Sequence, residues 1–208
     1  MDILAQAFIT LAITIDPIGV AALFTGLTPG VDFAHRRAIA LRGTIIAGIV
    51  LVAFALLGSL LLRTLGVGIP AFRIAGGVLL FMLAIDMVFV RHSGLRATTA
   101  SEEAEAERKS DISVFPLAIP LLAGPGAITS MVLLMQRAGG DLAMQSGILL
   151  VLGVVLGLTL AALLMAATIM RMLGVTGTNV VSRVSGIILA ALAAQFVIDG
   201  WQGAFGAP

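Results

Sequence analysis

The sequence predicts an all-α membrane protein with six transmembrane helices, arranged as two inverted three-helix repeats with broken helices 1 and 4. Three observations lead to this prediction: the composition, the apolar stretches, and landmarks that recur at one interval. The 208 residues are 60% hydrophobic and 11% charged, and their mean hydropathy is +1.15. About a quarter of the residues of a soluble domain are charged, so we expect a lipid bilayer around this chain.

Six apolar stretches approach the roughly 20 residues that a helix needs to span a bilayer. The first contains Asp16, and the fourth contains Pro116, Pro120 and Pro125. No Lys or Arg precedes Arg36, so the first stretch lacks the positive n-region of a signal peptide and is expected to remain as a span. The stretches cover residues 3–31, 43–62, 74–90, 112–136, 142–170 and 184–198, the last of which can be extended toward residue 179.

The Lys and Arg residues of the loops predict the orientation, because they are more numerous on the cytoplasmic side. An outside N-terminus leaves only Arg63, Arg73 and Arg137 in outside loops. We therefore expect a multi-pass protein of the plasma membrane (the bacterial inner membrane) with both termini outside. The residues expected on the inside are Arg36, Arg37, Arg42, Arg91, Arg96, Arg108, Lys109, Arg171 and Arg183.

Landmarks recur along the chain at one interval. The interval from Pro17, in IDPIG, to Pro125, in AGPGA, equals the interval from RTLGV at 63–67 to RMLGV at 171–175. Several landmarks in matching spans predict an internal repeat. The first repeat covers residues 1–90, a charged cytoplasmic loop covers 91–111, and the second repeat covers 112–208.

Each predicted repeat contains three spans, an odd number, so the second repeat enters the membrane from the opposite side. Inverted repeats are common in secondary transporters, whose substrate sites lie near the midplane on discontinuous helices. The expected mechanism is alternating access, with one repeat rocking against the other.

Two Pro/Gly motifs, TIDPIGV at 14–20 and AGPGA at 123–127, predict a break in the first span of each repeat. Proline removes a backbone donor, and glycine allows backbone conformations that other residues avoid. The N-terminus of a half-helix attracts a carboxylate, and free carbonyls attract an ammonium group or a cation. A small zwitterion such as glycine or alanine meets both demands. The candidate substrate-binding or coupling residues are Asp16, Pro17, Ile18, Gly19, Gly124, Pro125, Gly126, Ala127 and Thr129.

Asp16 is an acidic residue inside a span, which is costly and by default a functional candidate. It could cap the second half-helix, bind a substrate amine, or carry the coupling proton. Gly124 occupies the matching position of the second repeat. The break itself therefore does not require a carboxylate, which favours one of the two functional roles.

Other classes of protein find less support in the sequence. The chain contains no cysteine, no metal-ligand spacing, no Walker loop and no GxSxG motif, so we expect neither an enzyme nor a cofactor. A net charge of +1 gives no argument for a nucleic-acid partner. Gly153 and Gly157 form a GxxxG motif, which permits close packing within the bundle or in a homo-oligomer.

Three segments resemble the MarC family (UPF0056) of bacterial and archaeal membrane proteins: IDPIGVAALFTGLT at 15–28, PLAIPLLAGPGAITSMVLL at 116–134 and SRVSGIILAALAAQFVIDG at 182–200. The resemblance implies six spans and a place among LysE-type transporters. It also implies, from SnatA-like members, transport of small neutral amino acids. The sequence departs from the commoner DPIGN pattern by carrying Val20 after Gly19.

These observations predict a secondary transporter, an exporter or exchanger of small neutral amino acids, with a proton or sodium as the coupling ion. The first alternative is a channel-like or efflux protein for other small metabolites, which uses the same breaks without coupling. The second is a non-transporting membrane protein. An intramembrane enzyme is less well supported than either.

Overall fold

The structure is a computed structural model that describes residues 3–90 and 112–206. All regular elements in these two ranges are helices. The predicted loop at 91–111 lies outside the described residues. The helices are α1 (Ile3–Ile15), α2 (Pro17–Leu27), α3 (Phe33–Thr64), α4 (Ile69–Phe89), η1 (Ser113–Leu122), α6 (Pro125–Arg137), α7 (Leu142–Leu164) and α8 (Ala166–Phe205).

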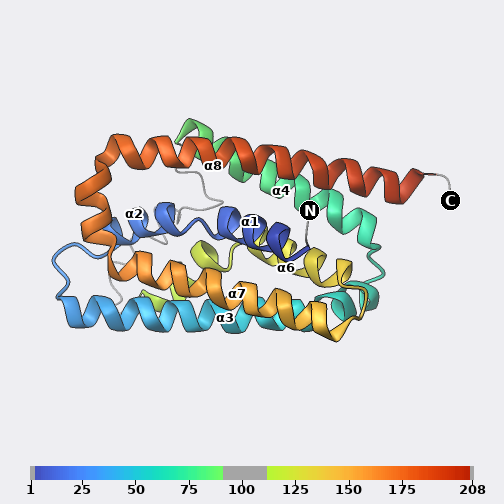
Figure 1. The fold of residues 1–208 in the computed structure, drawn as a ribbon, viewed down its shortest axis with the longest axis horizontal. Coiled ribbons are helices and arrows are strands. Elements are labelled where there is room, and N and C mark those ends of the chain that lie inside the picture. Colours follow the sequence, from blue (N-terminus) through green and yellow to red (C-terminus); the bar gives the residue numbers. More distant parts are fainter. Residues whose placement is uncertain (1–2, 91–111, 207–208) are drawn as a thin grey trace.

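The helices confirm the prediction of an all-α membrane protein. Five helical segments of the described residues are long and apolar enough to cross a membrane, with α1 and α2 together forming the first of them. The bent pair of η1 and α6 brings the number to six if it is taken as one span. Figure 1 shows that α1–α2 and η1–α6 run in opposite directions along the long axis of the molecule. The inverted relation of the two halves stays a prediction.

The helices form three layers (Figure 1). One outer layer contains α4 and α8, the middle layer contains the two broken helices α1–α2 and η1–α6, and the other outer layer contains α3 and α7. In the α1–α2 span 56% of the most apolar window is buried, against 22% to 33% in the spans formed by α3, α4, α7 and α8. The broken helices are therefore shielded from the surroundings by protein on both sides.

Two apolar cores separate these layers. The larger joins the middle layer to α3 and α7, and includes Leu11, Leu51, Leu117 and Leu152. The smaller lies between α4 and α8 and includes Leu133 of α6. Helix α6 thus contacts both cores, and together with α1 and α2 it links the two outer layers.

Helices α4 and α8 have the most extensive contact of any helix pair in the described residues. Glycines allow their backbones to approach closely: a Cβ at Gly77 would lie 2.8 Å from the carbonyl oxygen of Ala193, and one at Gly186 would lie 3.0 Å from that of Ala84. These two helices belong to different predicted repeats. The tertiary structure therefore interleaves the two halves of the chain.

Two helix starts differ most from the prediction. Helix α3 begins at Phe33, ten residues before the predicted span, because Asp32 caps it by accepting a hydrogen bond from the backbone N–H of His35 at 3.0 Å. The last helix begins at Ala166 rather than near residue 179, and turns at Gly174, whose φ of 63° favours glycine. An apolar run marks the part of a helix inside the bilayer, whereas caps decide where the helix begins.

Among the residues that the structure describes, none packs against the GxxxG motif. Both Gly153 and Gly157 lie on an exposed face of α7, and a Cβ at either would meet no atom within 4 Å. The predicted homo-oligomer stays a prediction.

Candidate functional site

The first break occupies a single residue. Asp16 has left-handed backbone angles, with φ 52° and ψ 72°, between the last residue of α1 and the first of α2. Its N–H donates to the carbonyl of Ala12 and its carbonyl accepts from the N–H of Val20, both at 3.0 Å. Pro17 follows at the first position of α2, where a missing N–H does no harm. The sequence thus forms two helices in series with a short interruption.

The carboxylate of Asp16 folds back over the start of α2. Its Oδ1 accepts a hydrogen bond from the N–H of Gly19 at 3.1 Å, and the residue is 4% exposed. Of the three roles considered for Asp16, the helix cap is therefore present in the structure. A buried carboxylate in a span is also the kind of group that binds cations or protons in transporters.

The second break is longer and more irregular. Helix η1 has π-type hydrogen bonding and leaves helical geometry at Phe115 and Ile119, each with φ near −130°. Both residues precede a proline, which disfavours the helical conformation at the residue before it. The axis then bends by 57° between η1 and α6. The run of prolines at 116, 120 and 125 accounts for this interruption.

Gly124 begins α6 without a side-chain cap. A Cβ at this position would lie 2.6 Å from the carbonyl oxygen of Pro120, so only glycine fits. The next donors, the N–H groups of Gly126 and Ala127, belong to buried residues. The two breaks thus differ in charge: a carboxylate covers the start of α2, whereas Gly124 offers no acceptor to the start of α6, where the helix dipole is positive.

Hydroxyl groups near the breaks have different surroundings. Thr14 Oγ1 donates to the carbonyl of Thr10 at 2.8 Å, within its own helix. Ser130 is fully buried, and its hydroxyl has no hydrogen-bond partner in the described part of the chain. A buried hydroxyl without a partner is costly and needs an explanation. It lies one helical turn beyond Gly126 and Ala127 in α6.

Thr129 faces α4, because its methyl group fills the space that the missing side chain of Gly76 leaves. It also lines a mostly apolar hollow of about 280 Å³ that lies between α3, α4 and α6. Pro125 lines the same hollow. The sequence prediction thus selected a residue that borders an open space beside the second break.

The structure brings the two breaks into one core. Ile15 and Val20 flank Asp16, Ala123 and Ala127 flank the second break, and all four belong to the larger apolar cluster. Pro17 and Ile18 are only half-buried. The role of the remaining predicted residues in binding or coupling stays a prediction.

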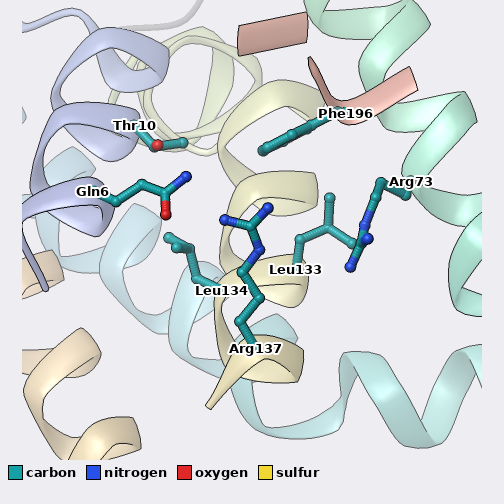
Figure 2. Close-up of a pocket in the computed structure, with 7 residues that line it drawn as sticks. All are labelled: Gln6, Thr10, Arg73, Leu133, Leu134, Arg137 and Phe196. Atoms are coloured by element: carbon teal, nitrogen blue, oxygen red, sulfur yellow. The ribbon is translucent and has the colours of Figure 1, made fainter. Parts of the chain in front are cut away.

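A second polar group of residues was not predicted. A small cavity of about 10 Å³, which we call the arginine cavity, lies between α1, α4, α6 and α8 (Figure 2). Its lining residues are Gln6, Thr10, Arg73, Leu133, Leu134, Arg137 and Phe196.

The prediction that Arg73 and Arg137 lie in loops was therefore wrong, whereas the side of the membrane predicted for them stays a prediction. Arg73 lies in the second turn of α4, and Arg137 is the last residue of α6. Arg137 Nη2 donates to Asp199 Oδ2 of α8 at 2.9 Å, and Gln195 Nε2 donates to Asp199 Oδ1 at 2.5 Å. In a sequence, a charged residue at the end of an apolar run looks like a loop residue. In the structure these side chains point inward between helices.

One signal in the sequence could have located this cavity. Gln6, Thr10 and Thr14 are four residues apart, which places them on one face of α1. Gln6 and Thr10 line the arginine cavity, and Thr14 is buried one turn further, next to the break at Asp16. A polar face of α1 therefore leads from the cavity toward the first break.

The apolar spans, the shielded middle layer and the two interrupted helices define a multi-pass α-helical integral membrane protein. Residues 1–205 match the family described as "MarC family integral membrane protein". The chain belongs to the MarC family.

Its relatives carry names that describe membrane location only. A "UPF0056 membrane protein" of Archaeoglobus fulgidus is 38% identical over 195 residues, which cover 93% of this chain and 90% of that protein. "UPF0056 membrane protein YvbG" of Bacillus subtilis is 33% identical over 202 residues, covering 97% and 95%. A relative in Methanocaldococcus jannaschii is 35% identical over 199 residues, covering 95% of this chain. No solved structure matches the chain.

Proposed function

We propose that this protein is a secondary transporter, an exporter or exchanger of small neutral amino acids such as glycine and alanine. The observation that carries this proposal is the contrast between the two breaks. One is covered by the buried carboxylate of Asp16, and the other has an N-terminus that Gly124 leaves uncapped, while their flanking residues share one core. Opposite charges at two interrupted helices suit a solute with one ammonium and one carboxylate group.

In this proposal the start of α6 holds the carboxylate of the solute. The N–H groups of Gly126 and Ala127 and the unpartnered hydroxyl of Ser130 supply the donors. Asp16 holds the ammonium group or carries the coupling proton, and its hydrogen bond to Gly19 keeps the carboxylate in place when the site is empty. The hollow beside Pro125 and Thr129 provides a route to this position.

The proposed conformational change follows from the layers. Motion of one whole repeat against the other would separate α4 from α8, the most closely packed pair. We infer instead that α4 and α8 move together, as one body, over the middle layer. Apart from their contact with each other, these two helices meet mainly α1, α2 and α6 of the middle layer, and this boundary is the one proposed to shear.

Counterflow in proteoliposomes tests the function. Vesicles that contain the purified protein and unlabelled alanine are diluted into labelled alanine, and the label inside is followed. A carrier accumulates label transiently above equilibrium, whereas a pore only equilibrates it. Vesicles loaded with lysine or glutamate serve as controls and should give no acceleration.

Equilibration without acceleration would support the channel-like alternative. No movement of glycine, alanine or serine in any gradient would reject the transporter assignment and favour a non-transporting role. A proton gradient and a sodium gradient, applied separately, identify the coupling ion.

A further inference from the structure

We propose that Arg73 and Arg137 form a second binding site, which takes the carboxylate group of a small organic solute in the arginine cavity. In the empty protein Asp199 occupies this site as an internal counter-ion. The carboxylate class is argued from the cavity itself, and only the identification of the solute as an amino acid rests on the proposed function.

The two arginines are in different states. The guanidinium of Arg137 is paired with Asp199, and the two side chains are 28% and 19% exposed. Arg73 is half-buried and makes no hydrogen bond or ion pair within the described residues. Figure 2 shows the side chain of Arg73 descending from α4 on the other side of Leu133 from Arg137. A cation between membrane helices is costly without a counter-ion, so Arg73 calls for an anion that the described residues do not supply.

Two guanidinium groups line the cavity, and the one carboxylate that the described residues bring to it, that of Asp199, is paired with Arg137. Guanidinium groups bind carboxylates with paired hydrogen bonds in a defined plane. A solute carboxylate would neutralise Arg73 and compete with Asp199 for Arg137.

The other lining residues favour a small organic solute over a bare inorganic ion. Gln6 points toward Arg137 from α1 (Figure 2), and its amide can both donate and accept hydrogen bonds. Leu133, Leu134 and Phe196 form apolar walls next to these polar groups. A small organic solute with one polar end and an apolar remainder matches this combination of lining residues.

The cavity is closed in this conformation. About 10 Å³ holds roughly one water molecule and no carboxylate. Binding therefore requires Asp199 to leave Arg137, which breaks the link from α6 to α8. The solute would reach the first break along the polar face of Gln6, Thr10 and Thr14.

The single tryptophan of the chain provides a probe for this site. Trp201 lies two positions after Asp199 on α8, so displacement of Asp199 should change its fluorescence. The purified protein in nanodiscs is titrated with acetate, glycine, methylamine, chloride and phosphate at constant ionic strength. We expect saturable changes with acetate and glycine and none with methylamine.

Substitution of the arginines and substitution of Asp199 should change the affinity for acetate in opposite directions. Arg73→Gln should weaken acetate binding at least about tenfold, because it removes the unpaired guanidinium. Arg137→Gln should weaken it as well. Asp199→Asn should strengthen it about tenfold, because the internal competitor is gone. Arg63→Gln removes one positive charge at the end of α3, outside the cavity, and should leave binding unchanged.

Arg73→Gln removes no hydrogen bond among the described residues, so it should fold and can test the site alone if Arg137→Gln does not. Unchanged acetate affinity in Arg73→Gln, or weaker affinity in Asp199→Asn, would overturn the proposal. Saturation by chloride or phosphate but not by acetate would overturn the organic class. The protein could show the expected changes in acetate affinity and still fail the counterflow assay. That result would uphold this site and reject only the transporter.

Discussion

Gly19 leaves room for the carboxylate of Asp16, which would overlap with any side chain at position 19. The same carboxylate accepts a hydrogen bond from the N–H of Gly19 at 3.1 Å. The two residues therefore form one unit, in which the glycine lets the acid cover the start of α2. Motif residues that looked like separate helix breakers in the sequence have complementary roles in the structure.

This relationship predicts that Gly19→Ala displaces the carboxylate of Asp16. Loss of the cap should lower the free energy of unfolding by about 1–2 kcal/mol and reduce transport. Gly26→Ala, in the same helix, is the matched control, because a Cβ at position 26 would meet no atom within 4 Å. Thermal unfolding of the purified variants measures the difference, and equal stability of the two variants would contradict the cap.

Asp16→Asn separates the cap from the charge. Asparagine can accept the same hydrogen bond and tolerates left-handed backbone angles, so the variant should keep the stability of the parent. It should abolish coupled transport in vesicles, whereas Asp16→Ala should lose both stability and transport. Normal pH-dependent transport by Asp16→Asn would exclude a coupling role for the carboxylate.

The second break should depend more on Gly124 than on Pro125. A Cβ at Gly124 would approach the carbonyl of Pro120 to 2.6 Å, and this backbone atom has little freedom to move. We expect Gly124→Ala to destabilise the protein by about 1–3 kcal/mol. Pro125→Ala should fold well and lower transport, because the added N–H changes the start of α6.

Gly153→Ala is the control for this pair, since it adds a methyl group to an open face of α7. It should be neutral or stabilise the helix by up to about 1 kcal/mol. A fully active Pro125→Ala variant would show that transport does not need the proline of the second break.

Ser130→Ala should raise or preserve stability while lowering transport. The hydroxyl is buried without a partner in the described residues, so its removal relieves a cost of about 1 kcal/mol in the empty protein. Thr159→Val is the control, because that hydroxyl bonds to the carbonyl of Val155 in its own helix at 2.7 Å. Unchanged alanine affinity and rate in Ser130→Ala would remove Ser130 from the proposed site.

The positions of the breaks could be predicted because their cause is local. Pro17 and Gly19, and likewise Gly124 and Pro125, restrict the backbone within a few residues of themselves. The cap by Asp16 was also among the predicted roles, since an acidic residue before a helix start is a local signal. The inverted repeat, which rests on the sequence landmarks, stays a prediction.

The arginine cavity could not be predicted because its parts are far apart in the chain. Arg137 and Asp199 are separated by 62 positions and meet only because the tertiary structure brings the end of α6 near α8. Each lies at the end of an apolar run, where a loop and a helix end look alike. Only the direction in which each side chain points distinguishes an interior charge from a surface one.

The sequence by itself determined the membrane environment, the helical fold and the two interruptions, because hydrophobicity and backbone restriction act over neighbouring residues. Tertiary structure alone decided that α4 pairs with α8 and that the broken helices lie between two outer layers. It also decided that the guanidinium of Arg137 meets the carboxylate of Asp199. Those arrangements depend on how glycines and side chains from distant segments fit together, and no single stretch of sequence contains that information.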